Sequence, residues 1–190
     1  MGINPIRLIG NWDEGWALDN HVVSSIYTGT DIYGHDTYNN TRSELGELLF
    51  YFKYRGRYDN LDKIIDLIKP FLDKWNIMND IDIIIPVPST KIRLYQPATE
   101  IAYAIAHLYK INFSEDVLKK TSDVESKNMD KANKELEGTI VALKRANRRY
   151  SALLVDDLYS SGGTLHECVR ALRSDPMLMN IFVLTMTKTR

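Results

Sequence analysis

Short continuous apolar runs and stretches with helically spaced apolar residues alternate along the second half of the chain. Residues 152–155, Ala-Leu-Leu-Val, form such a run, which is typical of a strand buried on both faces of a parallel sheet. Apolar side chains then recur between residues 165 and 172 at intervals of three and four, which indicates a helix. This stretch is therefore predicted to be a strand, a short polar turn and a helix.

The same alternation begins earlier and continues to the end of the chain. Residues 81–85 predict a β-branched strand, and a helix is expected from Pro97, capped near Gln96, because proline suits the first helical turn. Residues 181–186 predict a strand that closes the sheet. Strands alternating with helices favour an α/β fold, a Rossmann-like parallel sheet flanked by helices and joined by right-handed connections.

Weaker patterns lie between these elements. Residues 113–118 predict a short strand, and residues 139–143 fit either a strand or a turn of helix. The segment 119–138 is polar and charged, with helical character from residue 127 to residue 136.

Two helices are predicted before the first core strand. Ser43 is placed to cap the first helix, and Gly56 to end it. The second helix covers about residues 58–75, and Pro70 is expected to kink it or divide it.

Residues 1–42 differ in composition from the rest of the chain, because they are rich in Asn, Asp, Gly, Tyr and Thr. Within them, residues 16–19 and 22–27 are predicted to be the two short strands of a hairpin. We therefore expect two parts, an N-terminal segment of residues 1–42 and an α/β domain of residues 43–190.

Composition narrows the class of protein. The 24 Lys and Arg residues nearly balance the 25 Asp and Glu residues, so no global field draws the chain to nucleic acid or to a membrane. The single cysteine, Cys168, excludes a disulfide framework and is expected to be a small buried hydrophobe. No apolar run has the length of a membrane span and no signal peptide is evident, which favours a cytoplasmic protein.

The polar residues after the run at 152–155 indicate a ligand. Residues 160–164, Ser-Ser-Gly-Gly-Thr, offer three hydroxyls and two glycines just before a helix, which suits a phosphate monoester. Asp156 and Asp157 would repel that phosphate but suit neutral hydroxyls, or a metal held by the ligand. A ribose 5-phosphate combines both features. The alternative is an ordinary strand and turn with a chance acidic pair.

These residues resemble the type I phosphoribosyltransferases, whose signature residues 152–164 match at essentially every position. Residues 83–97 look like the pyrophosphate loop of the ComF-like branch, and residues 52–54 (Phe-Lys-Tyr) and 184–190 also resemble that branch. The resemblance implies the type I phosphoribosyltransferase fold. It also implies transfer of the ribose 5-phosphate of phosphoribosyl pyrophosphate to a nitrogen base, usually with magnesium.

The resemblance assigns roles to individual residues. Asp156 and Asp157 would orient the ribose hydroxyls and stabilise developing positive charge, with Mg held near them mainly by ligand oxygens and no direct protein cage. The remaining roles are 5-phosphate binding by Ser160, Ser161, Gly162, Gly163 and Thr164, pyrophosphate binding by Ser89, Thr90 and Lys91 with Arg93 as a weaker candidate, and closure of a flexible loop carrying Lys119, Lys120 and Lys127.

Three departures from the family pattern change the expectation. One cysteine cannot build the four-cysteine zinc module with which ComF-like proteins often begin. Ser160 stands where hypoxanthine-guanine transferases carry an Asp base, so the turn is closer to the orotate and adenine types. The sequence ends directly after the last predicted strand, so a C-terminal hood is not expected, and if a hood over the base exists, residues 1–42 and part of 119–138 must form it.

Two groups of residues keep alternative interpretations. One set could contact a nucleobase or could pin the N-terminal segment onto the core: Trp12, Trp16, His21, Tyr27, His35 and Arg42. A basic cluster could touch nucleic acid or could be a solvated turn, which we favour: Lys144, Arg145, Arg148 and Arg149.

Three functions are open at this point. The first is an enzyme that transfers the phosphoribosyl group to an unidentified base, or hydrolyses its donor. The second is a sensor that binds phosphoribosyl pyrophosphate or a nucleoside 5′-monophosphate without turnover. The third, an accessory protein in DNA uptake or defence, rests on the ComF likeness alone. A small-molecule substrate is expected, with a homodimer or a protein partner as further options.

Overall fold

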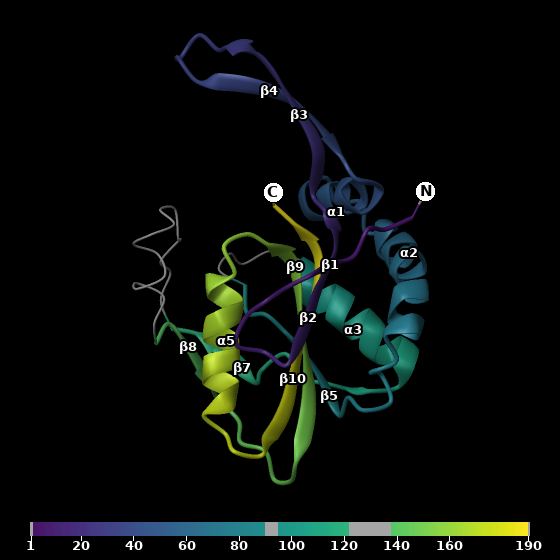
Figure 1. Ribbon diagram of the computed structural model, residues 1–190, viewed down its shortest axis with the longest axis vertical. Coiled ribbons are helices and arrows are strands. Elements are labelled where there is room, and N and C mark those ends of the chain that lie inside the picture. The colour runs from purple at the N-terminus through teal and green to yellow at the C-terminus, as the bar shows by residue number, and fades with distance from the viewer. Residues whose placement is uncertain (1, 90–94, 122–137, 190) are drawn as a thin grey trace.

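A six-stranded sheet runs through the middle of the computed structural model, which describes residues 2–89, 95–121 and 138–189 (Figure 1). The strand order is β1-β2-β10-β9-β5-β6, and all neighbours are parallel except β1 and β2. The strands are β1 (Ile6–Arg7), β2 (Glu14–Asn20), β5 (Ile83–Pro86), β6 (Asn112–Phe113), β9 (Tyr150–Tyr159) and β10 (Leu178–Lys188). The predicted α/β fold with a parallel sheet is confirmed.

Helices cover both faces of this sheet. One face carries α1 (Glu44–Tyr54), α2 (Asn60–Trp75) and α3 (Pro97–Tyr109), and the other carries α5 (Gly163–Arg173) (Figure 1). Along β9, Leu153 and Val155 pack with the first group, whereas Ala152 and Leu154 pack with α5. The continuous apolar run of β9 is therefore buried on both sides, as its sequence predicts.

Local signals place the helix boundaries. The hydroxyl of Ser43 accepts a hydrogen bond from the amide of Gly46 at 3.0 Å and caps α1, and α3 begins at Pro97 as predicted. Of the two effects expected of Pro70, a kink or a division of the helix, the division does not occur, because α2 continues through it. Ile68 and Leu72 on either side of the proline are fully buried, and this packing holds the helix together across the missing hydrogen bond.

Two predicted strands differ in extent from the prediction. The one expected at residues 113–118 is divided, since β6 joins the main sheet while β7 (Leu118–Lys120) pairs antiparallel with β8 (Ile140–Ala142). The segment at 139–143 is thus a strand and not a helical turn. β9 runs past the acidic pair to Tyr159, because β10 pairs with it along that whole length. The helical character expected at 127–136 lies outside the described residues.

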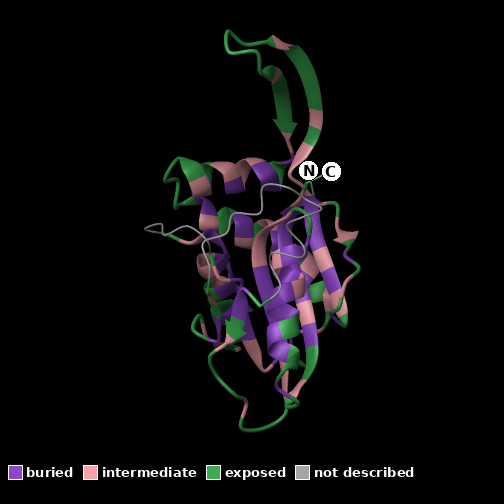
Figure 2. Cartoon of the chain, turned by 90° about the vertical axis from the view of Figure 1, so that its left-hand side faces the viewer, coloured by how far each residue is buried: buried purple, intermediate pink, exposed green. Residues whose placement is uncertain are grey.

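The hairpin predicted from residues 16–19 and 22–27 is wrong. β2 instead lies parallel to β10 in the main sheet, where Ala17 and Leu18 are fully buried. β10 is consequently an interior strand and does not close the sheet. The following strand, β3 (Val22–Thr30), pairs with β4 (Asp36–Arg42) to form a two-stranded ribbon that projects from the body (Figures 1 and 2).

Two smaller findings complete the fold. Cys168 is fully buried against the sheet, as its apolar neighbours predict. Among the residues that the structure describes, every helix is too short or too polar to cross a membrane.

Candidate functional site

The carboxyl ends of β5 and β9 lie side by side in the middle of the sheet. Pro86 is in register with Val155, and the amide of Val87 donates to the carbonyl of Val155 at 2.9 Å. The segment that follows β5 therefore starts next to Asp156 and Asp157, about seventy positions further along the chain. In open α/β sheets, ligands bind at this edge.

A cavity of about 220 Å³ opens at this edge. It collects predicted site residues from three separate segments: Ser89 after β5, Asp156 and Asp157 on β9, and Thr164 at the start of α5. The other residues that line it are Lys53, Val87, Pro88, Gln96, Pro97, Ala98, Thr99 and Leu158. The cavity thus contains at least one residue from each of three predicted sets: those for pyrophosphate, for the ribose and for the 5-phosphate.

The two acids in this cavity have different surroundings. Lys53, in the last turn of α1, places its Nζ 2.6 Å from Oδ2 of Asp157, and both side chains are less than one-fifth exposed. Asp156 accepts a hydrogen bond from the amide of Asp157 at 2.8 Å. Burial, and then the neighbouring negative charge of Asp157, raise the pKa of Asp156 to about 7. Asp156 therefore titrates near neutral pH.

The sequence singles out Lys53 only through a local resemblance and assigns it no role. No periodicity or motif within α1 shows that its last turn reaches the carboxyl end of β9. The ion pair becomes visible only when α1 is packed against the sheet beside β10 and β2.

The turn before α5 has the geometry that a phosphate site needs. Gly162, at the N-cap position, has φ of 81°, and a Cβ placed there would lie 2.6 Å from the hydroxyl oxygen of Tyr159. The position accepts only glycine without rearrangement. No side chain caps this helix, so its first amides point toward any ligand that approaches. Thr164 lines the cavity, whereas Ser160 and Ser161 are exposed beside it.

A second polar group lies next to the acidic pair on the side of β10. Nδ1 of His21 is 3.1 Å from the hydroxyl of Thr187, and that hydroxyl donates to the carbonyl of Asp157 at 3.5 Å. Burial, and then the positive charges of Arg42 and Lys53, lower the pKa of His21. Thr187 was not predicted as a site residue, because nothing in the sequence shows which residue of β10 lies beside Asp157.

Among the six residues considered for base recognition, His21 is the one tied by hydrogen bonds to the acidic pair. Trp12 donates to the carbonyl of Leu8, and Trp16 donates to Glu14, so both indoles are held within the body. These contacts favour the second interpretation for the two tryptophans, in which they hold the N-terminal segment against the core.

The other three candidates are also placed. Tyr27 and His35 belong to the ribbon, on β3 and in its connecting turn. Arg42, at the end of β4, lies 3.8 Å over the ring of Phe50 and bonds Glu47 at 3.3 Å.

Several predicted site residues cannot be placed in the cavity. Thr90, Lys91, Arg93 and Lys127 lie outside the described residues. Lys119 and Lys120 lie on strand β7, paired with β8, rather than on a loop.

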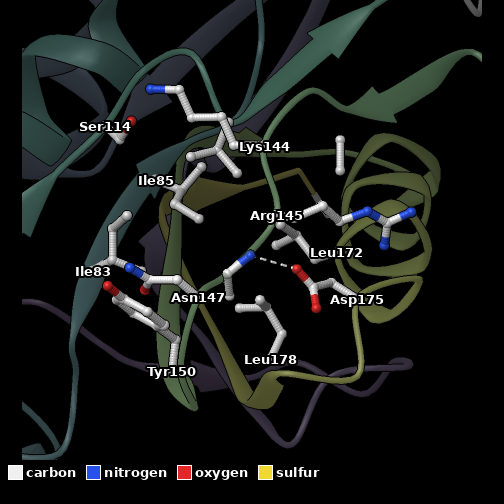
Figure 3. Close-up of a pocket in the computed structure, with 13 residues that line it drawn as sticks. Ile83, Ile85, Ser114, Lys144, Arg145, Asn147, Tyr150, Leu172, Asp175 and Leu178 are labelled. Carbon is white, nitrogen blue, oxygen red and sulfur yellow. Dashed lines mark hydrogen bonds between the residues drawn. The ribbon is translucent and has the colours of Figure 1, made fainter.

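A larger cavity of about 320 Å³ lies near the amino ends of β5, β9 and β10 (Figure 3). Ile83, Ile85, Leu172 and Leu178 form much of its wall, and it contains none of the residues predicted for phosphoribosyl binding. Its carboxylate, Asp175, already accepts hydrogen bonds from the backbone. This cavity has an apolar character that does not suit a sugar phosphate.

Lys144 and Arg145 of the predicted basic cluster line this second cavity, and three of the four basic side chains contact other parts of the protein. Lys144 pairs with Asp116 at 2.6 Å, and Arg148 pairs with Asp82 at 3.0 Å. Arg145 donates to the carbonyl of Ser174 at 2.7 Å. These contacts favour a charged surface turn over a nucleic-acid interface.

Comparison with known proteins extends these observations to the fold. No family model matches the sequence, and no curated protein matches it. An adenine phosphoribosyltransferase structure aligns over 86% of this chain and 86% of its own, with a TM-score of 0.48 and 11% identity. UMP synthase of Leishmania donovani aligns over 84% of this chain and 28% of its own, with a TM-score of 0.41 and 16% identity.

Another solved structure is an adenine phosphoribosyltransferase from Trypanosoma brucei, in complex with AMP, pyrophosphate and ribose-5-phosphate. It aligns over 99% of this chain and 87% of its own, with a TM-score of 0.50 and 12% identity. This alignment and the parallel-rich sheet with helices on both faces lead to one conclusion: the chain has the fold of the type I phosphoribosyltransferases.

Proposed function

We propose that the protein binds phosphoribosyl pyrophosphate with Mg²⁺ and transfers its phosphoribosyl group to a nitrogen base. One observation carries the proposal: a single cavity holds the acidic pair of β9, the start of the segment after β5 and the first turn of α5. A ribose, a pyrophosphate and a 5-phosphate need three such sites at one place.

The 5-phosphate binds at the turn formed by residues 160–164. The uncapped amides of α5 and the hydroxyl of Thr164 donate to its oxygens, and Gly162 allows the backbone to come close. The exposed hydroxyls of Ser160 and Ser161 lie on the solvent side of the same turn.

The acidic pair holds the ribose. Carboxylates accept hydrogen bonds from the two ribose hydroxyls, and their charge stabilises the positive charge that develops on the sugar as the bond to pyrophosphate breaks. The bonding electrons leave with pyrophosphate, the lone pair of the acceptor nitrogen forms the new bond to C1, and the base releases one proton to the pyrophosphate or to water. Lys53 neutralises Asp157 before the ligand arrives, so ligand binding has to share or replace that ion pair.

Pyrophosphate leaves toward the segment after β5. Ser89 lines the cavity at that side, which supports its proposed role. Thr90, Lys91 and Arg93 follow it directly in the sequence and stay proposed pyrophosphate ligands.

The acidic pair is the feature of this site that fits magnesium. Within the described ranges, no group of three or more His, Cys, Asp or Glu side chains gathers at one point. Mg²⁺ is commonly bound through one or two carboxylates plus substrate phosphates and water, and Asp156 and Asp157 can supply the carboxylates. When bound, the ion would neutralise charge on the pyrophosphate.

The acceptor in the proposed reaction is a nitrogen base. The Trypanosoma brucei protein is described in complex with AMP, pyrophosphate and ribose-5-phosphate, and this supports a nucleotide product for the shared fold. Ser160 favours the orotate and adenine types of turn. His21, held beside the acidic pair, is our candidate for base contact. The ComF-like branch and a cytoplasmic location stay predictions from the sequence.

The experiment is release of pyrophosphate from phosphoribosyl pyrophosphate and Mg²⁺ across a panel of purine and pyrimidine bases. We expect the double variant Asp156→Asn/Asp157→Asn to lower turnover by about 100-fold or more. Asp66→Asn, which changes an exposed acid on α2, is the matched control and should retain wild-type turnover. Equal turnover in the double variant and the wild type would reject the proposal.

A second candidate function is a sensor that binds phosphoribosyl pyrophosphate without turnover. The Lys53–Asp157 ion pair favours it, because a ligand that replaces this contact would alter how the end of α1 is held. Calorimetric binding with no product from any base supports the sensor, and turnover of one base at an ordinary enzymatic rate rejects it.

A further inference from the structure

The ribbon formed by β3 and β4 is a two-stranded sheet separate from the main sheet. It projects from the end of the body where β2 leaves the sheet, and it is exposed over most of its length (Figures 1 and 2). No described strand pairs with its outer edges. Five large side chains on it are more than half exposed: Ile26, Tyr27, Ile32, Tyr33 and Tyr38. Two-stranded ribbons are marginally stable alone, and exposed apolar groups of this kind mark contact surfaces.

The ribbon nevertheless has a defined turn. Oδ1 of Asp31 accepts hydrogen bonds from the amides of Tyr33 at 2.8 Å and His35 at 2.9 Å, and the amide of Asp31 donates to the carbonyl of His35 at 2.8 Å. These bonds fix the connection between the strands. The ribbon therefore has a defined conformation, although it contains only two strands.

Its two edges differ in their capacity to accept another strand. On β3, the pairing register shifts between Val22 and Ser24 and again between Tyr27 and Gly29, which interrupts that edge. On β4, each residue from Asp36 to Arg42 has a partner in β3 and the strand contains neither Pro nor Lys. Natural edge strands use such residues and bulges to prevent pairing. β4 has the open edge.

The charge of the ribbon indicates which class of partner it can bind. Residues 22–42 contain one basic residue, Arg42, against two acidic residues, Asp31 and Asp36. Nucleic acid and anionic membranes are therefore disfavoured. A strand of another protein chain is the partner that suits this edge.

β4 is complementary to a second copy of itself. Its seven residues are centred on Asn39, so an antiparallel two-fold pairing puts Asp36 opposite the partner's Arg42 at both ends. The same register puts Thr37 opposite the partner's Thr41, and Thr–Thr and opposite-charge pairs both stabilise antiparallel strands.

Arg42 can take part in this contact through the exposed part of its guanidinium. Its Nη1 donates to Glu47 at 3.3 Å, its Nε is buried, and 25% of its side chain is exposed. A guanidinium carries five N–H donors, so the exposed ones can keep Glu47 and donate to a second carboxylate.

We propose that the ribbon is a dimerisation arm, in which β4 pairs antiparallel with β4 of a second copy about Asn39. The two ribbons then form one four-stranded sheet. The shared surface is small, so the dimer forms and dissociates with protein concentration. This assembly does not depend on the proposed function, and its tests need no substrate.

The first test is a disulfide at the two-fold axis. The pairing places residue 39 opposite the partner's residue 39, at a distance that a disulfide can bridge. The native Cys168 is fully buried and does not interfere. Asn39→Cys should form a covalent dimer on mild oxidation. Ser25→Cys, an exposed position on β3, is the control, because two strands would separate it from its copy. Equal cross-linking of both variants would overturn the proposal.

The second test exchanges the charges. Asp36→Lys and Arg42→Glu each put like charges opposite one another, and each should raise the dimer dissociation constant by about tenfold or more, as measured by analytical ultracentrifugation. The double variant restores opposite charges and should restore the dimer, with circular dichroism as the check on folding. A wild type that stays monomeric at high concentration, or singles as dimeric as the wild type, would contradict the inference.

Discussion

At the scale of single residues, the acidic pair at the end of β9 is a site with conflicting demands. Asp156 and Asp157 are adjacent and partly buried, and Lys53 neutralises one of them. The other keeps its proton up to about neutral pH. Proteins commonly tolerate the loss of stability that adjacent buried carboxylates cause where a ligand needs their negative charge.

Replacement of Asp156 by Asn should therefore stabilise the fold at high pH. The unfolded chain releases this proton near the ordinary pKa of 3.8, whereas the folded state holds it to about pH 7, so the free energy of unfolding falls as pH rises between these values. Asn cannot titrate and loses this dependence. At pH 8 we expect Asp156→Asn to be more stable by on the order of 2 kcal/mol, and near pH 4 to match the wild type. Urea denaturation across this range measures it, and parallel pH profiles would refute it.

Gly162 gives a second prediction at this scale. Gly162→Ala introduces a Cβ at positive φ that also meets the ring of Tyr159, so it should cost about 2 kcal/mol or more of stability. Gly138→Ala is the matched control: its φ of 80° is nearly the same, with no atom within 4 Å of the new Cβ, and it should cost about 1 kcal/mol. Thermal denaturation compares the two, and equal losses would show that the contact with Tyr159 is unimportant.

At the scale of elements, the sequence predicts those parts whose signals are local. The apolar run of β9, the glycine turn and the spacing of α5 lie within about twenty residues, and all three are present. Ser43 and Pro97 likewise mark helix starts through their own geometry. The errors concern pairing: β2 has the residues of a hairpin strand but lies beside β10, and this choice depends on contacts about 170 positions apart.

The ribbon should be separable from the core. No residue between 22 and 42 belongs to either buried core cluster. Replacing residues 23–41 by a short Gly-Ser turn should therefore leave the unfolding free energy within about 1 kcal/mol of the wild type, as measured by chemical denaturation, while the concentration-dependent dimer is lost. A loss of cooperative unfolding would show that the ribbon is part of the core.

At the scale of the whole molecule, the site results from topology. The order β10-β9-β5 places the carboxyl end of β5 next to that of β9, and the packing of α1 adds Lys53. Each polar group could be predicted from the sequence by itself, but the expectation that Ser89, Asp157 and Thr164 lie together came from the resemblance and not from their spacing. Lys53 and Thr187 could not be assigned a role in this way, because their partners lie on elements distant in the sequence.

The central claim is that this cavity binds a ribose carrying phosphates, and calorimetric titration with phosphoribosyl pyrophosphate and Mg²⁺ tests it most directly. We predict saturable binding to the wild type and a dissociation constant at least about tenfold higher for Asp156→Asn, a loss of about 1.4 kcal/mol in a variant that is more stable at the same pH. Asp66→Asn should bind as the wild type does. No binding by the wild type, or equal affinity in Asp156→Asn, would contradict the account.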